Sequence, residues 1–227
     1  MTGNEIGEEM LQEWDWQNAC PTGKPVPRSR AHREGIAHEG VHLWVIRCSP
    51  GGTEVLFQHR AGHKENYPNC LDITVGGHVP FGKVTGKIQK EAFEEIGISP
   101  PDEDLVDLGV YRYEEQDENM FHREFQRVYL YFCEQPLEEY RFNDGEVDGI
   151  FAVPLESLER LLEGDITFEA AGFDGEKCLR RCLSRSDFHP LLFTEPMKVY
   201  MEVVMASVKG YLREGRVANL MPAPGVL

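Results

Sequence analysis

Long apolar runs are missing from this sequence of 227 residues, and we expect neither a membrane-spanning segment nor a secretory signal at its start. No apolar run approaches the roughly 18 residues that a membrane span needs. The first ten residues, Met1 to Met10, are acidic and contain no apolar core, so they do not resemble a secretory signal. We therefore expect a cytoplasmic protein that has no membrane partner.

The cysteines do not show the spacing of the disulfide framework that is typical of a small secreted domain. Two of the six cysteines are spaced as neighbours on one helix face, but no histidine follows nearby to complete a zinc site. We expect reduced thiols. The six positions are Cys20, Cys48, Cys70, Cys133, Cys178 and Cys182.

Basic residues are also scarce: 23 Lys and Arg face 39 Asp and Glu, for a net charge of −16. This excess argues against nucleic acid or an anionic membrane as a standing partner. A phosphorylated substrate would enter a negative field, so bound metal and a few local cations would have to attract it. Arg60 and Lys64 are the candidate substrate-binding cations, and the alternative is that each is a solvated surface charge.

The chain contains enough apolar residues for one domain with a full core, at 41% hydrophobic and 27% charged. We expect an N-terminal extension over 1–36 with a short hairpin turning at Pro21–Lys24, a main domain over 37–214, and a loose tail over 215–227. Residues 166–190 carry no clear pattern.

Periodicity predicts an α/β unit in which strands alternate with a few helices. Thr194 is the expected N-cap of the last helix. The predicted strands are Val41–Cys48, Glu54–His59, Leu71–Val75, Leu105–Tyr113, Phe125–Cys133 and Gly149–Val153, and the predicted helices are Thr85–Ile96, Leu155–Glu163 and Glu195–Arg213.

Three carboxylates occupy one face of the first predicted helix. Glu91, Glu94 and Glu95 stand at i, i+3 and i+4, where like charges repel. Two of them also precede Gly97, the expected helix end, where the helix dipole disfavours anions. A solvated helix end is the alternative, but a hard cation such as Mg²⁺ or Mn²⁺ would compensate this arrangement.

The segment before this helix favours the cation. An apolar strand leads into Gly76-Gly77, and a further turn follows at Gly82. Strand, glycine loop and acidic helix together resemble the Nudix box, G-x5-E-x7-R-E-U-x-E-E-x-G-U, in which U is aliphatic. The match is close from Lys90 to Ile98. With Gly77 as the first glycine, the position of the first Glu of the box is occupied by Lys83, and the segment from there to Lys90 is one residue shorter than in the box. Lys90 also replaces the Arg of the box. Lys keeps the positive charge but cannot form the rigid two-pronged hydrogen bonds of Arg to two carboxylates.

Flanking segments resemble the Nudix branch that includes isopentenyl-diphosphate isomerase. These segments are Arg33–Ile46, Phe57–Arg60 and the residues around Glu146 and Phe151–Leu155, and the likeness spans about Trp14 to Leu162. It implies a mixed β-sheet sandwiched between helices (α/β/α), with the acidic helix lining a cleft. A homodimer is also plausible by this resemblance.

The resemblance implies metal-dependent hydrolysis of a diphosphate bond in a nucleoside-diphosphate-linked or related small molecule. Glu91, Glu94 and Glu95 would hold Mg²⁺ or Mn²⁺ together with the Gly77 carbonyl. Glu94, Glu95 or Glu146 would accept the proton of the attacking water.

Two alternatives remain. The isomerases use a Cys and a His/Glu metal cage; His42, His78 and Glu124 fit parts of such a cage, and His78 and Glu124 are also candidate substrate contacts. The Cys position, however, is Gly76.

The other alternative is a ligand-binding or regulatory module with weakened catalysis, in which Lys83 or Lys90 competes with the cation. We expect Lys83 to lie near the acidic cluster, because the loop from Gly77 to Gly82 has to fold back over the helix start.

Overall fold

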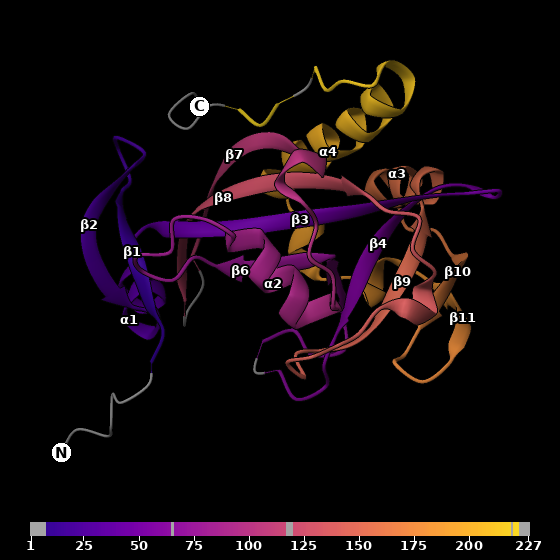
Figure 1. The fold of residues 1–227 in the computed structure, drawn as a ribbon, viewed down its shortest axis with the longest axis horizontal. Helices are drawn as coiled ribbons and strands as arrows, with labels where there is room; N and C mark the ends of the chain where they lie inside the picture. The colour runs from indigo at the N-terminus through magenta and orange to yellow at the C-terminus, as the bar shows by residue number, and fades with distance from the viewer. Residues whose placement is uncertain (1–7, 65, 117–119, 219, 223–227) are drawn as a thin grey trace.

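A single connected sheet of eleven strands organises the computed structural model, which describes residues 8–64, 66–116, 120–218 and 220–222 (Figure 1). The strands are β1 (Met10–Asp15), β2 (Cys20–Pro27), β3 (His38–Ser49), β4 (Gly52–Arg60), β5 (Leu71–Ile73), β6 (Val75–His78), β7 (Leu105–Gln116), β8 (Phe121–Phe132), β9 (Val147–Pro154), β10 (Phe168–Phe173) and β11 (Cys178–Leu183). The helices are α1 (Arg28–Glu34), α2 (Lys87–Ile96), α3 (Leu155–Glu163) and α4 (Glu195–Glu214), with short 3-10 turns at Asp102–Asp104, Leu137–Glu139, Arg185–Asp187 and Pro190–Phe193.

Strand β3 is the centre of this sheet. It pairs in parallel with β8 and antiparallel with β1, β4 and β6. The remaining strand pairs, such as β7 with β8 and β4 with β9, are antiparallel. The sheet is therefore mixed, with one parallel contact at its centre.

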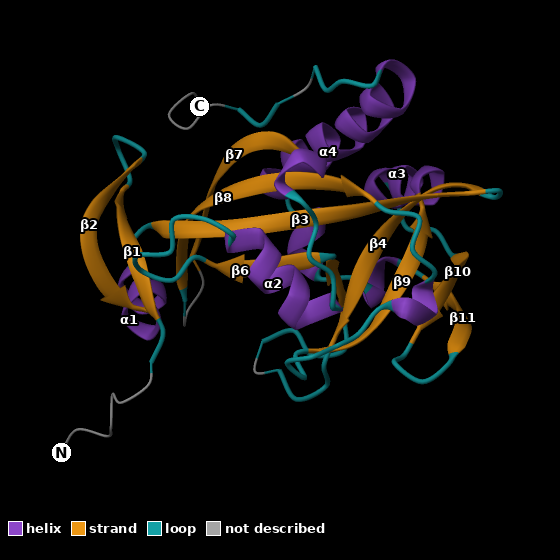
Figure 2. Cartoon of the chain, in the orientation of Figure 1, coloured by secondary structure: helices purple, strands orange, loops and turns teal. Residues whose placement is uncertain are grey.

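The two faces of β3 belong to two different cores. Leu43 and Val45 pack into one core together with Ile96 of α2. Trp44 and its neighbours on the opposite face pack into the other core with α4, where the Trp44 indole N–H donates to the Tyr200 hydroxyl at 2.8 Å. Figure 2 shows α2 lying against the sheet near β6, with α3 and α4 apart from it. The expected α/β architecture, a mixed sheet between helices, is confirmed.

Several predicted elements match the structure closely, including α3 at Leu155–Glu163, but the strand expected over Leu71–Val75 is divided. The Thr74 hydroxyl donates to the Leu56 carbonyl and accepts from the Val45 amide at 3.1 Å. A side chain thus replaces main-chain pairing at this position, so β5 pairs with β4 whereas β6 pairs with β3.

The hairpin turn expected at Pro21–Lys24 is wrong. These residues lie within β2, and the chain turns at 16–19 instead. The reason is local: the Asp15 carboxylate accepts the backbone N–H groups of Gln17 and Asn18 at 2.9 and 3.0 Å, which stabilises the turn.

Three other expectations from the sequence change. Residues 166–190 contain a hairpin, β10–β11. Thr194 is the N-cap residue of α4 as predicted, but its side chain forms no capping hydrogen bond, because the hydroxyl donates to the Leu191 carbonyl instead. The tail is anchored at Met221, which is 5% exposed and whose N–H donates to the Leu108 carbonyl at 2.7 Å. Residues 223–227 lie outside the described part of the chain.

Among the helices described, none is both long enough and apolar enough to cross a lipid bilayer.

Substitution of the glycine that ends α2 is predicted to destabilise the fold more than the equivalent substitution after α4. Gly97 and Gly215 have φ of 74° and 68°, so alanine at either costs about 1 kcal/mol in backbone strain. A Cβ at Gly97 would also lie 2.8 Å from Arg141, whereas a Cβ at Gly215 meets open space. We expect Gly97→Ala to lose about 1–3 kcal/mol more unfolding free energy than Gly215→Ala in urea titration. Equal losses of unfolding free energy in the two variants would contradict the close contact between Gly97 and Arg141.

Candidate functional site

A cavity of about 650 Å³ opens beside the acidic face of α2. Its wall combines α2, the end of β6, the loop after β4 and the loop before β9. The residues named from the sequence gather there: Arg60, Lys64, Gly77, His78, Glu91, Glu94, Glu95, Glu124 and Glu146.

Glu95 is the most deeply placed of the three α2 carboxylates, at 5% exposure. It lies there because α2 packs Ile88, Ala92 and Ile96 against the sheet, which turns the adjoining helix face inward. Its carboxylate accepts the Gln58 amide at 3.0 Å and the Gly76 N–H at 3.3 Å. Burial raises the pKa of Glu95 well above its ordinary value, although the Gly76 hydrogen bond acts in the opposite direction.

The other two carboxylates share a cation from their own helix. The Lys90 ammonium lies 3.0 Å from a Glu91 oxygen and 2.7 Å from a Glu94 oxygen. Partial burial opposes the charge on Lys90, but its hydrogen bonds to Glu94 and Glu91 raise its pKa. The expectation that Lys83 lies against this cluster is wrong: among the described residues Lys83 forms no ion pair, and it is not part of the cavity wall.

The backbone of β6 approaches the acidic helix closely. A Cβ on Gly77 would lie 2.4 Å from the Glu91 carboxylate, so a larger residue there would displace the Glu91 side chain. The three carboxylates of α2 and the glycine backbone of β6 together offer the oxygen ligands that a hard divalent cation prefers. The residues present therefore fit Mg²⁺ or Mn²⁺, provided that the Lys90 ammonium yields its place between Glu91 and Glu94.

The two nominated substrate cations are both paired. Arg60 donates to the Asp72 carboxylate at 3.2 Å and to the carbonyls of Asn66 and Tyr67, so it braces the loop that follows β4. Lys64 forms a close ion pair with Glu146, and both residues line the cavity. Of the two cations, Lys64 is held by one partner only among the contacts described.

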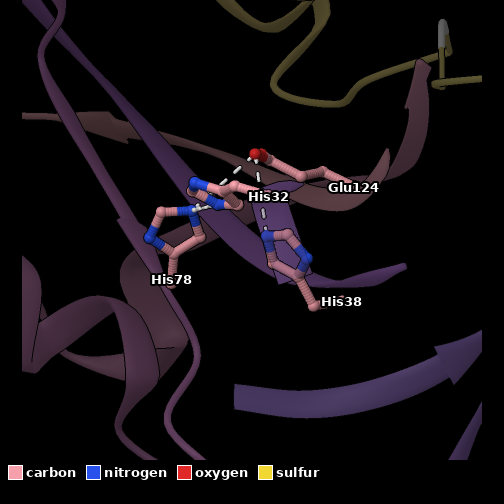
Figure 3. Close-up of side chains that lie close together, drawn as sticks. All are labelled: His32, His38, His78 and Glu124. Atoms are coloured by element: carbon pink, nitrogen blue, oxygen red, sulfur yellow. Dashed lines mark hydrogen bonds and ion pairs between the residues drawn. The ribbon is translucent and has the colours of Figure 1, made fainter. Parts of the chain in front are cut away.

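A second cluster lies on another part of the wall (Figure 3). One ligand atom from each of His32, His38, His78 and Glu124 lies within 4.8 Å of the others. The sequence had indicated His78 and Glu124 but missed His32 and His38. The expectation that His42 joins them is wrong: its buried ring pairs with the Tyr200 hydroxyl at 3.0 Å and lies outside the group.

Strand register brings this cluster together. His38 pairs with Glu124 across the parallel β3–β8 contact, and His78 pairs with Gly40 across β3–β6. Gly40, two residues after His38, points no side chain into the space between them. Helix α1 then places His32 over the group, with its Nε2 3.2 Å from the Nε2 of His78. The spacing of these residues in the chain gave no sign of this convergence.

Burial and mutual contact set the charges of the cluster. Desolvation, reinforced by neighbouring imidazoles, lowers the pKa of His32 to about 3 and also lowers that of His38. Burial opposes ionisation of Glu124, but hydrogen bonds from His122 and His78 hold its pKa well below the usual range. At neutral pH the ionised Glu124 carboxylate therefore lies beside the neutral rings of His32 and His38.

Comparison with known proteins shows which family this chain belongs to. The profile of the NUDIX domain matches residues 38–171, which is more than half of the chain. The chain therefore belongs to the Nudix family.

Relatives of similar size and of larger size share this region. An uncharacterized Nudix hydrolase of Clostridium acetobutylicum is 29% identical over 189 residues, covering 81% of this chain and 91% of that protein. Nudix hydrolase 3 of Arabidopsis thaliana is 26% identical over 81% of this chain, which spans only 25% of that protein. The crystal structure of DR0079 from Deinococcus radiodurans shares the fold, with a TM-score of 0.52 and 22% identity over 69% of this chain and 90% of that one.

The buried charge of Glu95 is predicted to make the metal-free protein less stable as pH rises. Because burial raises the folded-state pKa of Glu95 above 4.5, the folded chain keeps a proton that the unfolded chain releases. Unfolding free energy then falls as pH increases from that value, and Glu95→Gln is expected to flatten the fall. Denaturant unfolding from roughly pH 5 to about pH 8, with EDTA, measures this. The exposed-acid variant Glu103→Gln should keep the wild-type slope; an identical slope in the Glu95 variant would contradict the buried site.

Proposed function

We propose that this protein catalyses metal-dependent hydrolysis of a diphosphate bond in a nucleoside-diphosphate-linked or related small molecule. The observation that supports this most directly is the placement of Glu91, Glu94 and Glu95 on one cavity wall beside Gly77, in a chain of the Nudix family. Nudix domains bind small diphosphate molecules, and the nearby relatives are named Nudix hydrolases.

Mg²⁺ or Mn²⁺ would be held by Glu91, Glu94 and Glu95, with the Gly77 carbonyl as a further ligand. When bound, the ion neutralises phosphate charge and lowers the pKa of a water molecule. Glu95 already has a fixed orientation through Gln58 and Gly76, so it would offer its free oxygen without reorganisation. Lys90 would move from Glu91 and Glu94 as the ion enters.

Glu146 is our candidate for the residue that accepts the proton from the attacking water, ahead of Glu94 and Glu95. Burial opposes its ionisation, but the Lys64 ammonium holds its pKa below the ordinary value, so it is a carboxylate at neutral pH. A substrate phosphate that engages Lys64 would weaken this ion pair. The pKa of Glu146 would then rise, which makes the carboxylate a better base while substrate is present.

Recognition of the substrate would use the cations and imidazoles of the wall. Lys64 would meet a phosphate, and Arg60 would keep its loop in place while adding positive potential. His78 and Glu124 line the same cavity and would contact the more distant part of the substrate. A homodimer and a cytoplasmic location stay predictions.

A module with weakened catalysis is the second candidate, and one contact favours it. Lys90 stands where a cation would neutralise Glu91 and Glu94. If it does not yield, the fold would bind a ligand without turnover.

Isomerisation of a prenyl diphosphate has less support. Gly76 provides no thiol, and Cys70 lies outside the cavity wall, where its Sγ donates to the Tyr67 carbonyl. Burial raises the pKa of the Cys70 thiol to about 12, so it is not a thiolate at neutral pH.

The decisive experiment is a hydrolysis screen of diphosphate compounds with Mg²⁺ and Mn²⁺, in which the products are identified. We expect Glu94→Gln and Glu95→Gln each to lower turnover by at least about a hundredfold, because each removes a charged ligand of the ion. Glu103→Gln, an exposed carboxylate on the 3-10 turn at Asp102–Asp104, should retain full activity. Full activity of both site variants at saturating Mg²⁺ would refute the proposed metal site.

Lys90→Met is expected to tighten Mg²⁺ binding by about tenfold, or about 1.4 kcal/mol, because it removes the ammonium that competes for Glu91 and Glu94. The control is Lys87→Met, which removes the same charge from the same helix, where Lys87 pairs with Glu39 away from the cavity. Calorimetric titration compares the two variants. Equal affinities would show that Lys90 yields freely, and the weakened-module alternative would lose its support.

A further inference from the structure

A chain of hydrogen bonds through three side chains runs from the core beneath α4 to the cavity. The Trp44 indole N–H donates to the Tyr200 hydroxyl oxygen at 2.8 Å, and the same oxygen lies 3.0 Å from the Nδ1 of His42. Trp44 and Tyr200 are both 0% exposed, so water does not compete for these groups. The chain ends at His42, whose ring is part of the cavity wall.

The donors and acceptors of this chain allow one arrangement of protons. An indole N–H can only donate, so the Tyr200 oxygen accepts it, and the Tyr200 O–H needs an acceptor of its own. Within the described part of the chain, that acceptor is the Nδ1 of His42. A proton on Nδ1 instead would leave a buried hydroxyl without an acceptor, which destabilises a fold. The proton of a neutral His42 ring is therefore on Nε2.

This Nε2–H is available to a ligand. Burial lowers the pKa of His42 to about 4, so the ring is neutral at physiological pH and carries a single proton. The hydrogen bond described for the His42 side chain involves Nδ1 only. His42 therefore presents a fixed hydrogen-bond donor to the cavity, and the hydrolysis mechanism proposed above does not use it.

The donor borders the space where Gly76 has no side chain. His42 pairs with Gly76 across β3–β6, and a Cβ on Gly76 would lie 3.9 Å from the His42 Nε2. The Gly76 N–H donates to Glu95 at 3.3 Å, and a Cβ on the next residue, Gly77, would contact Glu91. The glycine backbone of β6 thus borders both the His42 ring and the α2 carboxylates. A small molecule held by those carboxylates would extend past this backbone to His42.

Apolar residues of the core beneath α4 form part of the same cavity wall. His42 lies on the same face of β3 as Trp44, which packs into that core. Ile73, Leu192 and Met197 belong to the core and also line the cavity. In apolar surroundings a hydrogen bond is strong and an unpaired donor is costly. A fixed donor in such a wall therefore favours a ligand that carries an acceptor.

We propose that His42 determines substrate specificity by donating its Nε2–H to an acceptor on the organic group attached to the diphosphate, while Trp44 and Tyr200 position it by holding this tautomer. His42 acts here on the substrate of the proposed hydrolysis, so this role rests on that function. The organic group then carries a carbonyl oxygen or a ring nitrogen at this point. A hydrocarbon chain would leave the donor unpaired.

The tautomer is tested without any substrate, by ¹⁵N NMR of the histidine rings in the full chain at neutral pH. We expect a protonated Nε2 and an acceptor Nδ1 for His42, with His42→Gln identifying the signals. In Tyr200→Phe the Nδ1 loses its donor, so a second tautomer with the proton on Nδ1 should appear. A proton on Nδ1 in the wild type, or an unchanged His42 signal in Tyr200→Phe, would overturn the proposal. The wild-type spectrum decides this point if Tyr200→Phe fails to fold.

Specificity is measured with benzyl diphosphate and pyridylmethyl diphosphate, which differ only in one ring nitrogen that accepts a hydrogen bond. In mildly alkaline buffer with Mg²⁺, the wild type should favour the neutral pyridine compound by about tenfold in kcat/KM, and His42→Phe should lose this preference. His42→Gln keeps an N–H donor and should retain part of it. His63→Phe replaces an exposed histidine outside the cavity wall and should retain all of it.

Failure of hydrolysis and failure of the His42 contact give separate results. Where neither compound is turned over with Mg²⁺ or Mn²⁺, the ratio of their calorimetric dissociation constants replaces the ratio of kcat/KM. Equal values for the two compounds in the wild type, or an unchanged ratio in His42→Phe, would refute the role of His42 in either measurement.

Discussion

The structure depends on β3 being buried on both faces while it pairs with strands on both edges. Leu43 and Val45 enter the core beneath α2, and Trp44 enters the core beneath α4, so neither face is free to slide. Because side chains alternate along a strand, a shift of one residue would exchange the two faces and bury the wrong set. This constraint fixes β6 and β8 against β3, and with them His78 and Glu124. The geometry of the site is therefore set by the packing of apolar residues that lie outside the site itself.

Charge compensation is the second theme of the molecule. The chain carries a net charge of −16, and nine of its 39 acidic residues line one cavity. Each cluster there uses a different partner: Lys90 for Glu91 and Glu94, Lys64 for Glu146, and imidazoles for Glu124. Glu95 accepts hydrogen bonds from neutral donors and has no cation beside it, and its burial therefore raises its pKa. The cavity is thus a set of anions whose present partners could be exchanged for cations or for a phosphorylated ligand.

Local features were predictable because they depend on residues close in sequence. The spacing of Glu91, Glu94 and Glu95 places them together on any helix, and Gly97 ends that helix with φ of 74° as its position suggested. The same reasoning failed for Lys83, because the course of a glycine-rich loop is not fixed by local spacing. Lys90, one helical turn from Glu94, was already in reach by spacing alone. The divided strand at Thr74 could not be foreseen, since its cause is a hydroxyl bonded to the distant Leu56.

The sequence by itself determined the family, the class of fold and the acidic helix, since these follow from periodicity and from a contiguous motif. Tertiary structure decided which ionisable groups are buried, which are paired and which converge. His32 and His38 stand apart from His78 and Glu124 in the chain, and the pairing of β3 with β6 and β8, together with the placement of α1, brings them together. The physical reason is that hydrogen-bond register and core packing act between distant segments. Burial then alters the charge of groups that would be ordinary in water.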